Sequence, residues 1–216
     1  MPQPDNGHTG CQCNCQPADT TYGLLGVAVG KWLREGSPES GAVFEELQER
    51  FALLRRERLT RPAIFVGAGT CGLGAGAGKT LKAVRAFIAE RQLDADVIEI
   101  GCIGICSAEP LLDVQLPGRA RVSFKSVTQD KVAGLLSEVL AGRIPAEHAL
   151  GQFRAAGLEP WPDVNYLDEH PFFAPQTRWV LANCGVIDPA QIDEYIAFGG
   201  YAGLARALRR FTPAEL

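Results

Sequence analysis

The sequence predicts an α/β protein in which helices cover the faces of a mixed β-sheet. Short apolar runs that are typical of strands alternate with longer segments whose apolar residues recur every three or four positions, the period of a helix. Two of the strand-like runs are joined by Pro117-Gly118-Arg119, which is a hairpin signal, so part of the sheet is antiparallel. A central sheet with helices on its faces buries the apolar sides of both kinds of element.

The elements of the expected domain, residues 41–141, follow one another without long gaps. We expect a helix that begins at Gly41 behind a Ser40 cap and ends before Arg61, strands at 63–66, 96–100, 111–116 and 120–124, and helices at 79–91 and from a Thr128 cap to Leu140. The order is helix, strand, helix, strand, strand, strand, helix. That order predicts a thioredoxin-like fold.

The two ends of the chain differ from this domain. Residues 1–40 predict an irregular extension that contains Cys11, Cys13 and Cys15. Alternate spacing places these three sulfurs on one side of an extended strand, where they could bind one metal ion. We favour the other interpretation, a mobile tail with incidental thiols.

After the domain, proline and glycine predict a linker at 142–165, followed by a helical segment at 166–216. Its helices are expected at 174–183, 189–197 and 201–210, and Cys184 is expected at the buried end of the first. Trp161 and Trp179 are expected to pack the linker against these helices. The last six residues look like the first turn of one more helix, which suggests a truncated chain.

Composition excludes several functional classes. The chain has 216 residues, of which 46% are hydrophobic and 21% charged, as in ordinary soluble domains. A net charge of −4 argues against non-specific nucleic-acid binding. No apolar run approaches the roughly 20 residues needed to cross a bilayer, and the first residues lack the basic and apolar regions of a secretory signal. These features predict a cytoplasmic protein, in which seven cysteines indicate metal or redox chemistry rather than disulfides.

The glycine-rich stretch after the first strand has three interpretations. Gly67-Ala68-Gly69-Thr70-Cys71-Gly72 fits a dinucleotide-binding turn with Glu99 as the ribose ligand, but the hairpin disagrees with a doubly wound parallel sheet. Gly78-Lys79-Thr80 partly matches a phosphate-binding loop that lacks its first glycine. In the third interpretation, which we favour, the glycines let the backbone approach a thiolate-bound cluster and turn N–H groups toward its sulfurs.

Three cysteines support the third interpretation. Cys71 lies in the glycine-rich stretch, and Cys102 and Cys106 lie in the loop after the next strand. A thioredoxin-like sheet holds these two loops side by side. Thiolates on neighbouring loops are the ligands of small iron–sulfur clusters.

These motifs resemble a known family. The stretch from Gly101 to Pro110, with the hairpin after it, resembles the thioredoxin-like [2Fe–2S] ferredoxin domain placed ahead of the flavin- and NADH-binding subunit of NADH dehydrogenases, bidirectional hydrogenases and formate dehydrogenases. The motifs at 170–178, 183–189 and 192–201 resemble the entry to that subunit's flavoprotein domain. The resemblance implies a multi-subunit oxidoreductase, in which electrons pass from NADH through a flavin to iron–sulfur clusters.

The chain departs from the family in two ways. The family's first loop carries two cysteines, but here the loop has Cys71 and none among 73–78, so three thiolates leave one iron site unfilled. The domain then has no stable cluster, which we favour, or a labile one, or one completed by a ligand from elsewhere. The family's FMN, NAD and [4Fe–4S] sites also lie beyond residue 216. We therefore expect no catalytic residues in this chain, and either electron transfer or, alternatively, subunit docking by a domain without a cluster.

Overall fold

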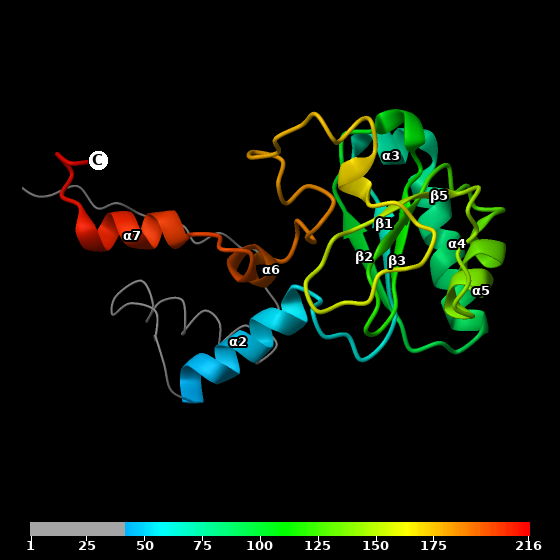
Figure 1. Ribbon diagram of the computed structural model, residues 1–216, viewed down its shortest axis with the longest axis horizontal. Coiled ribbons are helices and arrows are strands. Elements are labelled where there is room, and N and C mark those ends of the chain that lie inside the picture. Colours follow the sequence, from blue (N-terminus) through cyan, green and yellow to red (C-terminus); the bar gives the residue numbers. More distant parts are fainter. Residues whose placement is uncertain (1–41) are drawn as a thin grey trace, which may run out of the picture. The chain divides into compact units, whose positions relative to one another are not determined.

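The computed structural model describes residues 42–216 (Figure 1). The expected extension at 1–40, with Ser40, Cys11, Cys13 and Cys15, lies outside the described residues. The described residues divide between two compact units, one holding 42–202 and the other 203–216. The first unit contains the sheet and the cysteine loops.

The sheet has five strands in the order β2-β1-β3-β4-β5. Their bounds are β1 Ala63–Gly67, β2 Asp96–Ile100, β3 Leu112–Gln115, β4 Val122–Phe124 and β5 Ala149–Gln152. β1 pairs in parallel with β2, whereas β3, β4 and β5 each join the sheet antiparallel to a neighbour. The mixed α/β sheet is thus confirmed, and its β2-β1-β3-β4 portion has thioredoxin-like order. The antiparallel β3 and β4 rule out a doubly wound parallel sheet.

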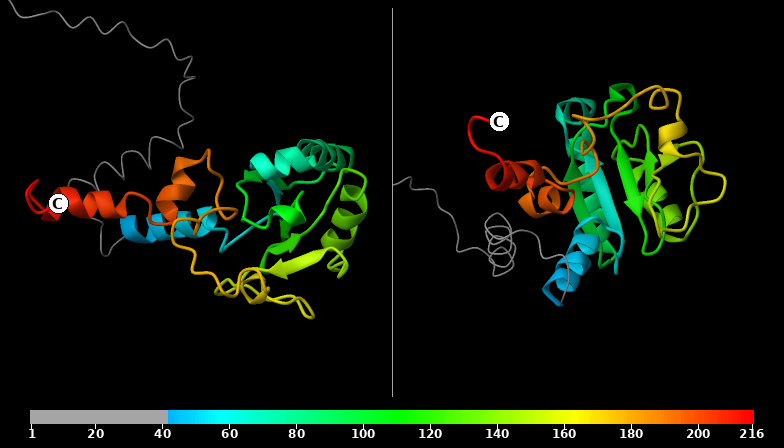
Figure 2. Two further views of the ribbon diagram at one scale, coloured as in Figure 1. Left: turned by 90° about the horizontal axis from the view of Figure 1, so that it is seen from above. Right: turned by 60° about the vertical axis from the view of Figure 1, so that its left-hand side comes forward.

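Two helices cover one face of this sheet. α4 (Ala77–Glu90) and α5 (Val132–Leu140) pack against each other and along the strands (Figures 1 and 2). Alternate residues of β1, Ile64 and Val66, belong to the core between the sheet and these helices. Thr80 is fully buried there, and its hydroxyl donates to the Val127 carbonyl at 2.7 Å.

The opposite face of β1 is covered differently. Ala63 and Phe65 point to that face, with Ile100 beside them. The guanidinium of Arg121 lies 3.7 Å from the Phe65 ring centroid, and that of Arg56 lies 5.1 Å from it. Arg56 follows α2 (Ala42–Leu54) and pairs with the buried Glu194 of α6 (Ile192–Ala197). Buried ion pairs and aromatic stacking therefore replace a second apolar helix layer on this face.

The expected linker at 142–165 is instead part of the sheet domain. Its residues 149–152 form β5, in which Gln152 pairs with Val122 of β4. Trp161 is 4% exposed, and its indole N–H donates to the Ala120 carbonyl at 2.8 Å. The sequence did not indicate this strand because prolines and glycines surround it. β5 is only four residues long, and it is stabilised by pairing with a strand that is distant in sequence.

Other expectations for the elements need correction. The glycine-rich stretch contains a short helix, α3 (Thr70–Ala75), and Lys131 rather than Thr128 stands at the start of α5. Residues 174–183 form turns rather than a helix, so Cys184 does not lie at a helix end. Trp179 is 84% exposed, which shows that this segment buries no apolar face that would stabilise a helix.

The remaining expected helices are present. α6 lies within the predicted range 189–197, and α7 (Ala202–Arg210) matches 201–210. Two single-turn 3₁₀ helices complete the described structure, η1 (Cys106–Ala108) and η2 (Leu167–Glu169). Among the described residues, no helix is both long enough and apolar enough to cross a membrane.

Candidate metal centre

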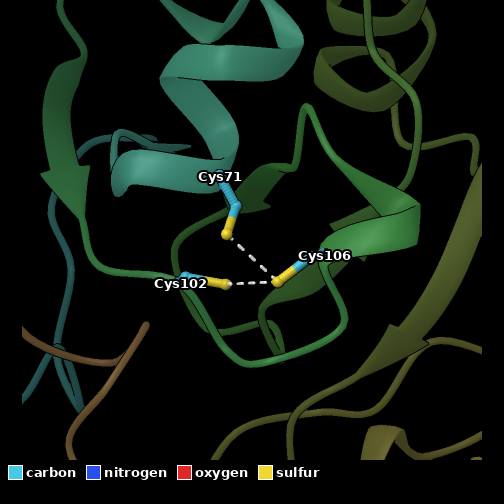
Figure 3. A group of neighbouring side chains, drawn as sticks. All are labelled: Cys71, Cys102 and Cys106. Atoms are coloured by element: carbon cyan, nitrogen blue, oxygen red, sulfur yellow. Dashed lines mark hydrogen bonds between the residues drawn. The ribbon is translucent and has the colours of Figure 1, made fainter.

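Cys71, Cys102 and Cys106 come together at the edge where β1 and β2 end (Figure 3). Cys71 lies in the first turn of α3, Cys102 follows β2, and Cys106 opens η1. The Sγ atoms of Cys71 and Cys106 are 3.2 Å apart, and those of Cys102 and Cys106 are 3.9 Å apart. All three sulfurs lie within 4.8 Å of one another.

The parallel pairing of β1 with β2 explains why these loops meet. Gly67 pairs with Ile100, so both strands end level with each other. The Ala68 N–H then donates to the Ile100 carbonyl at 2.8 Å, which extends the ladder into the loops. A Cβ at Gly69 would lie 3.0 Å from the Cys102 backbone nitrogen, so the close approach of the two loops leaves little room for a side chain at position 69.

A second glycine shapes the loop between Cys102 and Cys106. Gly104 has a φ of +103°, a conformation that side chains other than glycine rarely adopt. Its N–H donates to Cys102 Sγ at 3.2 Å, and the Cys106 thiol donates to the Gly104 carbonyl at 3.7 Å. A backbone N–H directed at a sulfur is typical of iron–sulfur sites, and here it comes from the loop after β2 rather than from the glycine-rich stretch.

The surroundings of two of the three thiols raise their pKa values. Burial raises the pKa of the Cys102 thiol above its usual value. The hydrogen bond with Cys71 raises the pKa of Cys106. Because a metal ion binds thiolates, its binding must release the thiol protons, and its affinity rises with pH.

Sequence reasoning missed one acidic residue beside the cysteines. Glu109 is 7% exposed, its Oε2 accepts the Leu111 N–H at 2.8 Å, and its Oε1 accepts no hydrogen bond from any described residue. Burial raises the pKa of this carboxyl group, and the hydrogen bond from the Leu111 N–H partly offsets that rise. The sequence signal was its place three residues after Cys106 and directly before Pro110.

The C-terminal part of the domain supports the cysteine loop. A Cβ at Gly185 would lie 2.0 Å from Ile103 Cγ2, so the two segments touch closely. The carbonyl of Gly185 accepts a hydrogen bond from the buried Arg121 guanidinium at 2.6 Å. Cys184 precedes this contact and is half-buried, but it does not belong to the three-cysteine group.

The three cysteines fit a thiolate-bound metal. A tetrahedral ion with metal–sulfur bonds near 2.3 Å places its sulfurs about 3.8 Å apart, close to the separations seen here. Soft thiolates favour zinc, copper(I) and iron–sulfur clusters over hard cations. Among the described residues, Cys71, Cys102 and Cys106 supply three of the four ligands that such a site takes.

Comparisons with known proteins find similarity to two hydrogenase subunits. No protein-family model matches the chain. The NADP-reducing hydrogenase subunit HndB of Solidesulfovibrio fructosivorans is 29% identical over 112 residues, which are 48% of this chain and 86% of that protein. Subunit HndC of the same organism is 56% identical over 41 residues, which are 19% of this chain and only 8% of that protein.

Solved structures with some similarity include a thioredoxin-like [2Fe–2S] ferredoxin from Aquifex aeolicus. One structure of it is 17% identical, with a TM-score of 0.39, over 47% of this chain and all of that chain. A second, of the wild-type protein, is 17% identical with a TM-score of 0.38, over 43% of this chain and 99% of that chain.

Proposed function

We propose that this chain carries an iron–sulfur centre on Cys71, Cys102 and Cys106 and belongs to a multi-subunit NADH:acceptor oxidoreductase. The observation that carries the proposal is the convergence of three thiols from two separate loops at one edge of the sheet. The similarity to two subunits of one NADP-reducing hydrogenase supports a place in such an assembly. Electrons from the nicotinamide would reach this domain through other parts of the complex.

The residues of the chain suit an electron carrier. An iron–sulfur cluster supplies one-electron oxidation and reduction when it is bound. The Gly104 N–H directed at Cys102 Sγ stabilises negative charge on that sulfur, which favours the reduced state. Cys71 and Cys106 are exposed, so a partner protein can approach the centre closely.

The C-terminal part of the chain has a separate proposed role. We propose that residues 166–216 begin a flavoprotein domain whose FMN, NAD and [4Fe–4S] sites lie outside this sequence. The motifs at 170–178, 183–189 and 192–201, which resemble the entry to such a domain, support it. This chain would then provide the accessory domain and a docking surface, and it would not reduce or oxidise NADH by itself.

Anaerobic expression tests the iron–sulfur proposal. We expect about two irons and two acid-labile sulfides per chain, with a visible absorption spectrum. Cys102→Ser is expected to lose most of the iron, because Cys102 is the half-buried member of the group and the one that receives the Gly104 N–H. Cys184→Ser is the matched control and is expected to keep iron and spectrum, since Cys184 lies outside the group.

The second candidate function is a docking module without a cluster. One observation in its favour is that the described residues place only three thiols at the site, one fewer than a cluster needs. Another is that the apolar side chains of Trp179 and Val180 are 84% and 95% exposed, and a partner protein could cover them. A colourless, folded, iron-free protein after anaerobic expression would contradict the carrier and leave this module.

A further inference from the structure

Two of the three thiols at the metal centre are close enough to react with each other. Figure 3 shows the Cys71 side chain extending from α3 toward Cys106, and the Cys106 sulfur turned toward that of Cys71. The Cys106 thiol donates to Cys71 Sγ at 3.2 Å, so the two sulfurs face each other directly. A disulfide bond of about 2.05 Å requires them to move about 1 Å closer, which rotation of the side chains can supply.

Exposure separates this pair from the other described cysteines. Cys71 and Cys106 are exposed, whereas Cys102 and Cys184 are half-buried. Cys102 Sγ also lies farther from Cys106 Sγ, at 3.9 Å, and it accepts the Gly104 N–H at 3.2 Å. A small disulfide molecule in solution therefore reaches Cys71 and Cys106 more readily than it reaches the other two.

The fold holds this pair together although its members are 35 residues apart in sequence. Cys71 lies in α3, which follows β1, and Cys106 lies in η1, in the loop that follows β2. The parallel pairing of β1 with β2 sets the spacing of these two segments. Because the second thiol is already in contact with the first, closing the bond within the chain is favoured over keeping a bond to a molecule from solution.

We infer that Cys71 and Cys106 form a reversible disulfide when the site holds no metal, which gives this chain a two-electron thiol–disulfide couple. The inference does not rest on the proposed iron–sulfur function, because it concerns the thiols alone. The disulfide removes two of the three thiolates, so the closed bond and a bound metal exclude each other.

The bond forms in two exchange steps with a low-molecular-weight disulfide such as oxidised glutathione. The thiolate of one exposed cysteine attacks a sulfur of that disulfide, so a mixed disulfide forms and one glutathione leaves as a thiolate. The thiolate of the other cysteine then attacks the first cysteine's sulfur, so the Cys71–Cys106 bond forms and the second glutathione leaves. The two protein thiols lose two electrons and two protons, and the glutathione disulfide gains them as two thiols.

The test treats the full chain, freed of metal with a chelator and then reduced, with oxidised glutathione under anaerobic conditions. The remaining free thiols are alkylated, and the tryptic peptides are analysed by mass spectrometry. We expect a cross-link between peptides 59–79 and 92–119, which carry Cys71 and Cys106, with a mass lowered by about 2 Da, and an alkylated Cys102. Dithiothreitol is expected to restore both thiols.

Three variants check which sulfurs react. Peptide 92–119 also carries Cys102, so Cys102→Ser is expected to keep the cross-link to peptide 59–79, whereas Cys71→Ser is expected to lose it. Cys184→Ser is the matched control and is expected to behave as the wild type, since Cys184 lies outside the three-cysteine group.

Three results in the wild type would overturn the inference. The first is alkylation of both Cys71 and Cys106. The second is a bond between Cys102 and Cys106, and the third is glutathione that stays attached to Cys71 or Cys106, because it would show that the second thiol does not attack. The wild-type peptides decide among these, so a variant that fails to fold does not affect the decision. Iron is not measured in this test, so the iron–sulfur proposal is decided separately by its own experiment.

Discussion

Asp113→Ala is expected to lower the free energy of unfolding by about 3–5 kcal/mol, because it leaves the buried Arg121 guanidinium without its carboxylate. The side chains of Asp113 and Arg121 are 2% and 7% exposed. Asp113 Oδ2 accepts from Arg121 Nε at 2.8 Å and also from Nη2. Burial lowers the pKa of Arg121, which shows that the charged guanidinium is poorly solvated where it lies.

The measurement is urea unfolding of the wild type and the variant under anaerobic conditions. Glu99→Ala is the matched control, because it removes the carboxylate of an exposed pair with Arg85 and is expected to cost less than about 1 kcal/mol. The double variant Asp113→Leu with Arg121→Met is expected to regain most of the loss, since it buries no unpaired charge. A loss below 1 kcal/mol for Asp113→Ala would contradict the assigned role of the pair.

The same ion pair connects the sheet to the C-terminal segment. Arg121 also donates to the Gly185 carbonyl, and Gly185 packs against Ile103 in the cysteine loop. Loss of Asp113 therefore removes the partner that holds Arg121 against this segment. We expect the iron of Asp113→Ala to be more accessible to chelators than that of the wild type, even at temperatures where the variant remains folded.

The sequence was sufficient for the parts of the fold whose signals are local. The β1, β2, β3 and β4 strands and the α4 and α5 helices were predicted from hydrophobic period and turn residues. The meeting of the Cys71 loop with the Cys102 loop followed from the order of the strands. β1 and β2 are parallel neighbours, so the loops that follow them begin at the same edge of the sheet whatever side chains these loops carry.

The missing parts depend on contacts that are distant in sequence. Asp113 lies in β3 and Arg121 directly before β4, each alternating with apolar residues as a solvent-facing polar residue would, so the sequence pattern did not indicate that they are buried. Glu109 is enclosed by Gly67 and Gly72, which lie far from it in sequence. β5 was obscured by neighbouring prolines and glycines, and it is defined by its pairing with β4.

The glycine-rich stretch shows the same distinction between pattern and contact. Its glycines look equivalent in sequence, but the structure gives them different roles. A Cβ at Gly72 would lie 2.0 Å from the Gly67 carbonyl oxygen, whereas a Cβ at Gly74 would meet nothing within 4 Å. Position 72 therefore requires glycine for packing, whereas position 74 does not.

Gly72→Ala is therefore expected to destabilise the domain by about 3 kcal/mol, at the upper end of the usual cost of overpacking. The added methyl group meets a backbone oxygen of β1, which cannot move away as a flexible side chain would. Relief of the contact must shift α3, and this shift moves Cys71 away from Cys106. We expect iron content after anaerobic reconstitution to fall together with the urea midpoint.

Gly74→Ala is the matched control, because it makes the same chemical change two residues away in the same helix. It is expected to leave stability unchanged or to raise it by about 0.5–1 kcal/mol, the usual gain of alanine over glycine in a helix. Its iron content should equal that of the wild type, since Gly74 is exposed and touches neither β1 nor Glu109. Equal losses in Gly72→Ala and Gly74→Ala would mean that the loss does not arise from the contact with Gly67, and would remove the packing reason for a glycine at position 72.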